Sequence, residues 1–339
     1  MAKPLRIAYL LEDTDLSGGV RIQLAQADAL IARGHQVTLC TKGPPLTWRS
    51  SNAEWAYVTS FYDLDASEFD FVVGTFWTSV PAAYELAGDR AVHLCQGYEG
   101  SFTAYEKERP EIEKVYRLPV PKLVVAEPLI EVCRTFHPDV TYIGQIVDDS
   151  FYRGKGTPPS DRTPRVLLAG ASQIDFKGID VGYGAATHCR WFGGDFSLVR
   201  VSPWAPSKEE PVKELVAEFH VALTSREMTA LVHSCDIFLG PSRRQEGFGL
   251  PAAEAMAASI PTVLTKIPSF LSFDPRRDYA LFADEEDAEG LGEYLGFLLA
   301  DPDLREQIGQ RGREVAEQFR SGETGIRLER FFLERKASR

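Results

Sequence analysis

The sequence of 339 residues predicts an α/β protein made of two Rossmann-like domains that face each other across a cleft. Three observations lead to this fold class. The chain is too long for one ordinary hydrophobic core. Short apolar runs alternate with helical patterns along its first half, and the alternation restarts after a stretch rich in Gly, Pro and charged residues. In such a fold the ligand is expected at the carboxyl ends of the strands.

The first half of the chain reads as about six strands joined by helices. The strands are the short apolar runs at residues 5–11, 36–41, 54–60, 69–77, 91–96 and 122–127. An amphipathic helix is expected over residues 21–34, where Gly34 ends it, and a shorter helix over residues 79–88. Strands that alternate with helices in this way indicate βαβ units and therefore a parallel sheet.

The second half follows residues 152–165, whose Gly, Pro and charged residues are typical of an interdomain linker. Strands are expected at residues 165–170, 195–202, 218–223, 236–242 and 260–265, and helices at residues 177–189, 225–235 and 250–259. From Asp287 onward the pattern is almost entirely helical. We therefore place the first domain at residues 1–153, the second at 164–320, and a C-terminal helix at 321–339 that would pack back on the first domain.

Composition narrows the classes of function. A net charge of -12 argues against a nucleic-acid-binding protein, but local cations and helix N-termini can still hold a small anion. The five cysteines are scattered and form no C-x-x-C pair, so we expect reduced thiols in a cytoplasmic protein. The first apolar run stops at Leu11 before acidic residues, which favours a strand over a signal peptide. No stretch is expected to span a bilayer, and contact with the inner face of a membrane stays open.

Residues 241–261, PSRRQEGFGLPAAEAMAASIP, join a glycine-rich loop to an alanine-rich helix. Gly247 and Gly249 let the loop backbone approach a ligand, and Pro251 favours a helix start whose free N–H groups can hold a phosphate. Glu246 and Glu254 bracket this segment. The arrangement suits a nucleotide sugar, with one carboxylate near the ribose hydroxyls and the other near the sugar. The alternative is a packed alanine-rich helix with an exposed glutamate.

The segment EGFGLPAAEAMA resembles the E-x7-E signature of retaining, GT-B-type glycosyltransferases of the family 4-like group 1. Further resemblances follow in the family's order at residues 17–39, 142–152, 176–186 and 219–242. They imply a nucleotide-diphosphate sugar as donor, held mainly by the second domain, and a first domain that shapes the acceptor side. The matching positions for donor binding are Gly18, Gly19, Lys177, Gly247, Phe248, Gly249, Leu250 and Glu254. Glu246 matches the position that faces the donor sugar and is the first catalytic candidate.

The chain departs from the family pattern at four places. One of them precedes the motif, where the family usually has Phe-x-Gly and this chain has Phe219-His220-Val221. The family usually has Gly-Arg at the end of the first strand of the second domain, with the arginine on the diphosphate; here Ser172 or Gln173 takes that place. Where most members have a histidine near the donor sugar, this sequence has Gln96, the second catalytic candidate. The lead-in to Glu246 is one residue longer than usual and carries two arginines. We expect one of the two, Arg243 or Arg244, to replace the missing phosphate ligand, and Arg244 is the preferred candidate; the alternative is a pair of solvated loop arginines.

Other candidates have simpler explanations. The histidines form no H-x-x-x-H or H-E pair, so neither a metal site nor a cofactor is expected. Residues 284–290, DEEDAEG, read as a solvated loop that caps the next helix. Glu99 is either a contact to the acceptor or part of a loop salt bridge.

The sequence therefore predicts a metal-independent hexosyltransferase that uses a nucleotide-diphosphate sugar and a saccharide, lipid-linked or small-molecule hydroxyl acceptor. Two alternatives stay open: a nucleotide-sugar-binding relative without turnover, and a GT-B-fold sugar-nucleotide epimerase. The sugar, the nucleotide and the acceptor are not specified by these residues.

Overall fold

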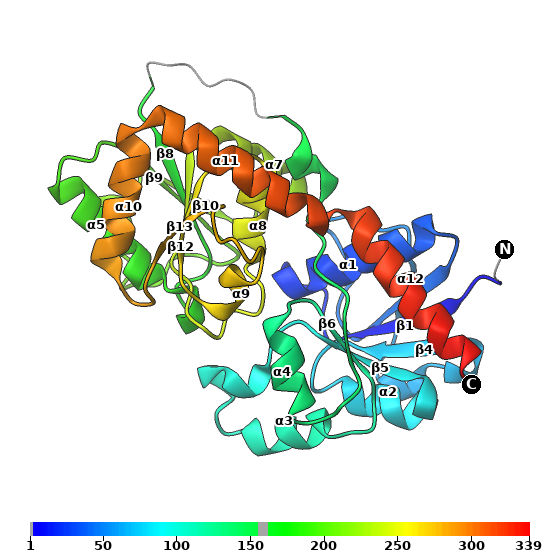
Figure 1. The fold of residues 1–339 in the computed structure, drawn as a ribbon. Coiled ribbons are helices and arrows are strands. Elements are labelled where there is room, and N and C mark those ends of the chain that lie inside the picture. Colours follow the sequence, from blue (N-terminus) through cyan, green and yellow to red (C-terminus); the bar gives the residue numbers. More distant parts are fainter. Residues whose placement is uncertain (1–2, 155–161) are drawn as a thin grey trace. The chain divides into compact units, whose positions relative to one another are not determined.

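The computed structural model describes residues 3–154 and 162–339, and the chain forms two units. The first unit consists of Met1–Ile146 and Phe319–Arg339, and the second of Val147–Gln318. Each unit has its own parallel sheet with helices on both faces (Figure 1). Within the described residues, no helix combines the length and the apolar character that a membrane crossing requires.

The sheet of the first unit has the strand order β3-β2-β1-β4-β5-β6-β7. Its strands are β1 (Arg6–Leu11), β2 (Gln36–Thr41), β3 (Glu54–Tyr57), β4 (Phe71–Gly74), β5 (Ala91–Cys95), β6 (Lys122–Val124) and β7 (Val140–Tyr142). β1 is the centre of the register, because Tyr9 pairs with Leu39 on one side and Val73 on the other. All three residues are fully buried, as expected where helices cover both faces of a parallel sheet.

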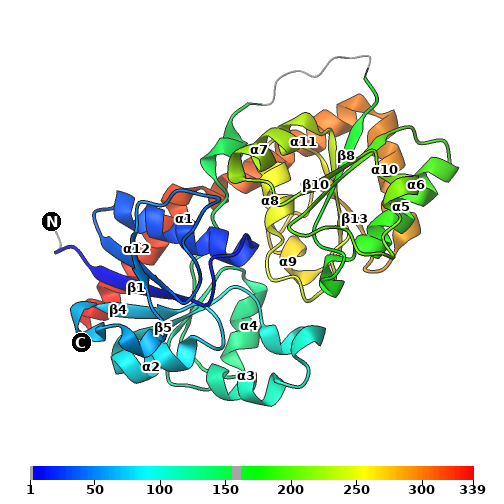
Figure 2. The ribbon, with the colours of Figure 1, turned by 180° about the vertical axis from the view of Figure 1, so that it is seen from behind.

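Five longer helices cover this sheet. They are α1 (Gly18–Ala32), α2 (Val80–Ala87), α3 (Arg109–Tyr116), α4 (Pro128–Arg134) and α12 (Ser321–Ala337). α1 and α12 pack together on one face, and α2, α3 and α4 lie on the other (Figures 1 and 2). α12 is anchored by Arg33, whose Nε donates to Glu329 Oε2 at 2.7 Å, and by Phe332, whose ring packs on Phe71 at 4.9 Å between centroids. The last helix is thus part of the first unit.

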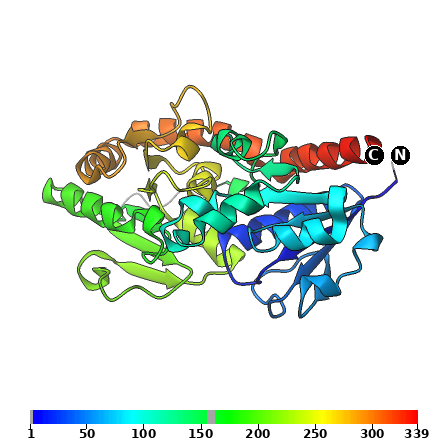
Figure 3. The ribbon, with the colours of Figure 1, turned by 90° about the horizontal axis from the view of Figure 1, so that it is seen from below.

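The sheet of the second unit has the order β10-β9-β8-β11-β12-β13. Its strands are β8 (Arg165–Ala169), β9 (Ser197–Ser202), β10 (Glu218–Val221), β11 (Ile237–Gly240), β12 (Thr262–Thr265) and β13 (Leu281–Ala283). Its helices are α5 (Ile179–Trp191), α6 (Val212–Leu215), α7 (Ser225–Ser234), α8 (Leu250–Ala257), α9 (Pro268–Leu271), α10 (Ala288–Ala300) and α11 (Pro302–Ala316). α5 and α10 lie side by side (Figures 1 and 3). Their contact closes a core of apolar residues from β8, β9, β11 and both helices.

The chain passes from the first unit to the second between Ile146 and Val147, earlier than the linker expected at residues 152–165. Tyr152 belongs to the second unit because its hydroxyl donates to Ala316 O at 2.5 Å and its carbonyl accepts from Arg313 at 2.8 Å. Residues 155–161 of the expected linker lie outside the described residues. The sequence also did not indicate β7 and β13, which have three residues each and are too short to show a periodic pattern.

Candidate active site

Lys177 and Glu246 form an ion pair at the carboxyl edge of the second sheet. Lys177 ends a short 3₁₀ turn after β8, and Glu246 lies in the loop after β11, the neighbouring strand. Lys177 Nζ lies 2.6 Å from Glu246 Oε2, and the same oxygen accepts from Ser242 Oγ at 3.2 Å. Their side chains are 20% and 8% exposed. An anion that binds Lys177 must therefore compete with Glu246 for the ammonium group.

Two glycines bring the β8 loop close to Lys177 and to β11. Gly178 has φ 60°, and a Cβ there would lie 2.0 Å from Pro241 O at the end of β11. Gly170 has φ 135°, and a Cβ there would lie 3.2 Å from the side chain of Lys177. Only glycine combines these positive φ angles with such close contacts. The stem of Lys177 consequently lies directly along the backbone of Gly170.

The glycine-rich segment before α8 is shaped by packing. Gly249 precedes the helix with φ 87°, and a Cβ there would lie 2.1 Å from the ring of Phe270. Phe248 is buried, and its ring packs on Phe273 at 5.0 Å between centroids. Leu250 begins α8, at the end where free N–H groups are available. These contacts explain Gly249 and Phe248 without a ligand, so a donor contact through Gly247–Leu250 stays a prediction.

Glu254 lies on α8 and is fully buried. The residues on both sides of it, Ala253 and Ala255, are fully buried as well, so this helix has no exposed stripe around its second turn. The alternative of an exposed glutamate on a packed helix is therefore wrong. A carboxylate is costly to bury without polar partners, which makes a structural or binding role necessary here. Its contact with a ribose stays a prediction.

The two adjacent arginines, Arg243 and Arg244, form ion pairs with different carboxylates. Arg243 is 14% exposed and pairs with Asp180 at 2.8 Å and with Glu286. Arg244 is 73% exposed, and its Nη2 lies 2.9 Å from Glu285 Oε2. Arg244 would have to leave Glu285 to bind a phosphate, so its role as a phosphate ligand stays a prediction. As expected for the acidic loop at residues 284–290, one of its carboxylates, that of Asp287, caps α10 by accepting from Gly290 N at 2.8 Å.

In the first unit, the structure brings Gly19 and Gln96 together. Gly18 and Gly19 begin α1 after β1, and the helix is capped by Ser17, whose hydroxyl accepts from Val20 N at 3.2 Å. Gln96 follows β5 and is half-buried. A Cβ on Gly19 would lie 3.5 Å from Gln96 Nε2, so the glycine leaves room for this amide beside the N-terminus of α1. This proximity does not assign Gln96 a catalytic step, so its catalytic role stays a prediction.

Glu99 is buried in the interior of the first unit, neither in a salt bridge nor at the surface. Tyr116 donates to its Oε2 at 2.5 Å, and the side chain is almost fully buried. Burial raises the pKa of Glu99 to about 7. The neighbouring His93 is also fully buried, and the desolvation lowers its pKa well below the usual value. The sequence placed Glu99 in a loop and could not show that the loop turns inward.

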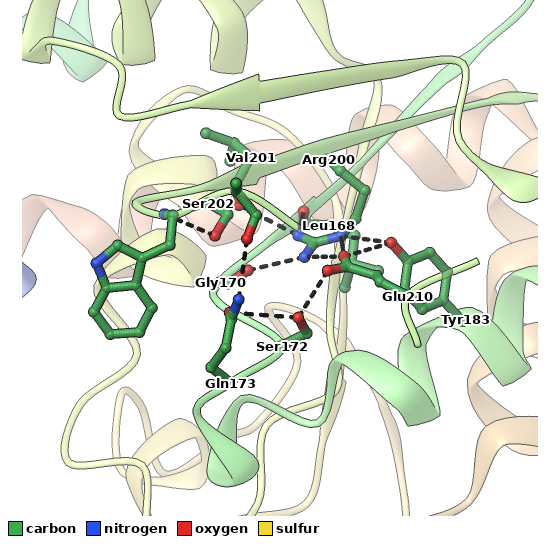
Figure 4. Close-up of polar contacts among 11 residues, drawn as sticks. Leu168, Gly170, Ser172, Gln173, Tyr183, Arg200, Val201, Ser202 and Glu210 are labelled. Carbon is green, nitrogen blue, oxygen red and sulfur yellow. Dashed lines mark hydrogen bonds and ion pairs between the residues drawn. The ribbon is translucent and has the colours of Figure 1, made fainter. Parts of the chain in front are cut away.

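Sequence reasoning missed a buried polar network of the second unit, which is centred on Arg200 (Figure 4). Arg200 lies on β9 and is fully buried, as is the side chain of its partner Glu210, at 2.7 Å. Glu210 Oε2 accepts from Ser172 Oγ at 2.7 Å, so the hydroxyl expected to face the donor is bonded within the protein. The signal was an arginine inside the apolar strand pattern SLVRVS, because a buried charge requires partners.

No group of three or more His, Cys, Asp or Glu side chains among the described residues is arranged to hold a metal ion. The sequence contains the triplet Asp-x-Asp at residues 13–15, 63–65 and 301–303, and none of these triplets belongs to such a group. The metal-independence of the reaction stays a prediction.

Comparison with known proteins identifies the segment that contains the loop of Glu246. Residues 213–315 match the family described as glycosyl transferases group 1. Residues 213–315 of the second unit are thus similar to a group 1 glycosyltransferase domain. The chain is 28% identical over 163 residues to the MMP alpha-(1->4)-mannosyltransferase of Mycolicibacterium hassiacum, which covers 45% of this chain and 38% of that protein. It is 32% identical over 113 residues to the N-acetyl-alpha-D-glucosaminyl L-malate synthase of Bacillus anthracis, which covers 32% of this chain and 29% of that protein. The matches thus span less than two fifths of these relatives.

Solved structures extend the likeness of fold beyond the group 1 domain. The structure of Anabaena Alr3699/HepE in complex with UDP-glucose has a TM-score of 0.78 at 13% identity and covers 99% of this chain and 100% of that chain. The sucrose-phosphate synthase of Thermosynechococcus elongatus has a TM-score of 0.77 at 15% identity, again over 99% and 100%. These similarities confirm the expected fold class, the two-domain α/β fold of GT-B glycosyltransferases.

Proposed function

We propose that this protein is a hexosyltransferase that moves a hexosyl group from a nucleotide-diphosphate sugar to a hydroxyl of a saccharide, lipid-linked or small-molecule acceptor. The observation that carries the proposal is the Lys177–Glu246 ion pair at the carboxyl edge of the second sheet, in which Glu246 belongs to the segment that matches the group 1 family. Two similarities support this assignment. One relative is named a mannosyltransferase, and the structurally similar HepE was solved in complex with UDP-glucose. We further propose that the anomeric configuration is retained.

On the donor side, Lys177 would neutralise the diphosphate together with the N–H groups at the start of α8. Glu254 would contact the ribose from within α8, and Glu246 would orient the sugar. Glu246 is held by Lys177 and by Ser242, which fixes its carboxylate in one conformation. Such preorganisation lowers the entropic cost of binding.

The reaction exchanges one bond for another. The bond between the anomeric carbon and the diphosphate oxygen breaks with its electron pair on the phosphate, and an acceptor oxygen forms the new glycosidic bond. The acceptor proton leaves with the phosphate as the nucleoside diphosphate departs. Lys177 would stabilise the charge that develops on the leaving oxygen, the contribution that a preorganised cation makes in a water-poor site. The first unit would shape the space for the sugar and the acceptor through Gly18, Gly19 and Gln96.

The test combines binding with turnover. A thermal-shift screen of UDP, GDP, ADP and their hexose conjugates should give one nucleotide that stabilises the wild-type protein, because a ligand that binds only the folded state raises its stability. The matching sugar nucleotide should then release nucleoside diphosphate when an acceptor is added. Lys177→Ala is the control and should lose both signals. A wild-type protein that no nucleotide stabilises would contradict the proposal.

A binding protein without turnover is the second candidate. It is favoured by one observation: Ser172 or Gln173 stands where the family has a phosphate-binding arginine, and the cation that is kept, Lys177, is paired with Glu246. Tight nucleotide binding with no release of nucleoside diphosphate from any sugar nucleotide and acceptor would support it. An isomerised sugar nucleotide, formed without acceptor, would instead indicate an epimerase.

The reaction should proceed without a divalent ion. Turnover that a chelator abolishes, and that magnesium or manganese restores, would contradict this part of the proposal. A lipid-linked acceptor would require contact with the cytoplasmic face of a membrane, and activity on acceptors in vesicles compared with soluble analogues tests it.

A further inference from the structure

The guanidinium of Arg200 is bonded to two parts of the second unit at once. Its Nη2 and Nε donate to Glu210 Oε1 at 2.7 and 3.1 Å (Figure 4). Its Nη1 donates to Leu168 O at 2.7 Å, and its Nη2 to Gly170 O at 3.0 Å. Leu168 and Gly170 belong to the end of β8 and its loop, whereas Glu210 belongs to the connection after β9. One side chain therefore joins two loops of the carboxyl edge.

The carboxylate of Glu210 completes the connection. It accepts from Ser172 Oγ at 2.7 Å and from Tyr183 OH at 2.6 Å, in addition to Arg200. Burial alone would raise the pKa of Glu210, but these hydrogen bonds outweigh it and hold the pKa below its ordinary value. A separate hydrogen bond, from Gln173 Nε2 to Ala205 O at 3.0 Å, ties the same two loops. The loop after β8 is thus held in place by one ion pair and several hydrogen bonds.

Gly170 links the Arg200–Glu210 pair to Lys177. Arg200 holds the carbonyl of Gly170, and the α-carbon of the same glycine lies against the stem of Lys177, since a Cβ there would be 3.2 Å from its Cβ and Cγ atoms. The ammonium end of Lys177 then reaches Glu246 at 2.6 Å. If Gly170 shifts, the surface that directs Lys177 shifts with it.

We propose that Arg200 and Glu210 are positioning residues that hold Lys177 in the orientation needed to bind the donor diphosphate. This deepens the proposed function and rests on it for the identity of the ligand. An ion pair that served stability alone would be replaceable by apolar residues of similar volume, often at no cost. The directed bonds to Gly170 and Ser172 have no apolar equivalent, because each one fixes the place of a particular backbone or hydroxyl group.

Glu210→Ala tests the proposal, with Glu218→Ala as its matched control. Glu218 also pairs with an arginine, Arg165 on β8, but at the opposite, amino end of the same sheet, where the Arg165 Nη2 to Glu218 Oε2 distance is 3.0 Å. The first measurement uses the ligand-free full-length protein: the rate at which an amine-acylating reagent modifies Lys177, followed by peptide mass spectrometry. Glu210→Ala should raise this rate several-fold by loosening the Lys177–Glu246 pair, and Glu218→Ala should leave it unchanged.

The second measurement is a double-mutant cycle with Lys177→Ala, read as affinity for the nucleoside diphosphate that stabilises the wild type. Glu210→Ala should weaken binding about tenfold, within the range known for residues that act through others. The double variant should bind no more weakly than Lys177→Ala alone, because both changes remove the same interaction. Losses that add, as independent structural damage would give, overturn the proposal. Added acetate should restore part of the affinity of Glu210→Ala, and chloride at equal ionic strength should not.

The two measurements separate this proposal from the function on which it rests. If no nucleoside diphosphate binds the wild-type protein, the proposed function fails, and the acylation rate of Lys177 still decides whether Glu210 positions it. An unchanged acylation rate in a folded Glu210 variant overturns the positioning role whatever the ligand is. Glu210→Gln, which keeps an acceptor for Arg200 and has nearly the same volume, takes the place of Glu210→Ala if the alanine variant does not fold.

Discussion

Lys177 and Glu246 come from the loops after two neighbouring strands, and their side chains meet at 2.6 Å. The cation expected to hold the diphosphate and the carboxylate expected to face the sugar thus neutralise each other. Their contributions to ligand binding are therefore coupled, since removing one partner changes the charge that the other presents.

Glu246→Gln and Lys177→Ala should consequently have opposite effects on nucleoside diphosphate. Lys177→Ala should weaken its binding, because the cation is lost. Glu246→Gln should bind it at least as tightly as the wild type, because Lys177 no longer has a competing carboxylate, yet should lower kcat. Isothermal titration and steady-state kinetics check both variants. Equal losses of affinity in the two would contradict the coupling.

The two arginines before Glu246 should respond differently to substitution. Arg243→Ala should lower the melting temperature, because it leaves Asp180 and Glu286 without their partner. Arg244→Ala should leave the melting temperature nearly unchanged, because its side chain is 73% exposed.

Nucleotide affinity decides whether Arg244 has a ligand role. If it leaves Glu285 for the diphosphate, Arg244→Ala weakens binding by more than about 0.5 kcal/mol, the usual scale of a surface substitution. Glu285→Ala should then bind more tightly, because it releases the arginine. A smaller loss in Arg244→Ala, at both low and high salt, would assign Arg244 to the surface.

Gly249→Ala should destabilise the second unit by more than about 2 kcal/mol, because it combines a positive φ with a collision against Phe270. Gly322→Ala is the matched control. No atom lies within 4 Å of the Cβ it would add at the start of α12, and the change should stay within about 0.5 kcal/mol. Chemical denaturation of the two variants measures the difference. Similar stabilities would mean that the loop before α8 rearranges freely.

Glu99 should make the stability of the first unit depend on pH. Its pKa is raised to about 7 by burial, so the folded protein keeps a proton that the unfolded chain releases above pH of about 4.5. The free energy of unfolding should therefore fall as the pH rises from 4.5 to 7 and level off above it. Glu99→Gln, which keeps a partner for Tyr116, should remove this slope and be more stable than the wild type at pH 8. An identical slope in the variant would contradict the assignment.

The sequence predicted the fold where the signal is local. Strands such as β1 and β11 are apolar runs bounded by turn residues, and the glycines around Glu246 stand next to the helix that they begin. Partner choice depends on residues far apart in the chain and could not be predicted. Arg243 and Arg244 are neighbours in sequence, yet they bind different carboxylates of the loop after β13.

The pairing of Arg200 with Glu210 shows the same limit. The two residues are ten positions apart, on a strand and in the connection that follows it, so no helical or strand period relates them. What the sequence did contain was the charge inside an apolar strand. That charge signals that a partner exists, but it does not identify the partner, because the fold selects it.

The C-terminal helix has a consequence for how the chain is made. α12 completes the first unit, although the whole second unit lies between it and Ile146 in sequence. Domains generally fold as units while the chain emerges from the ribosome, N-terminal parts first. Here the second unit can finish folding first, and the face of the first sheet that α12 covers, including Phe71, stays open until Phe319–Arg339 has been synthesised. The order of synthesis and the order of completion are therefore reversed, and a nascent chain stalled before Phe319 would carry a folded second unit beside an unfinished first one.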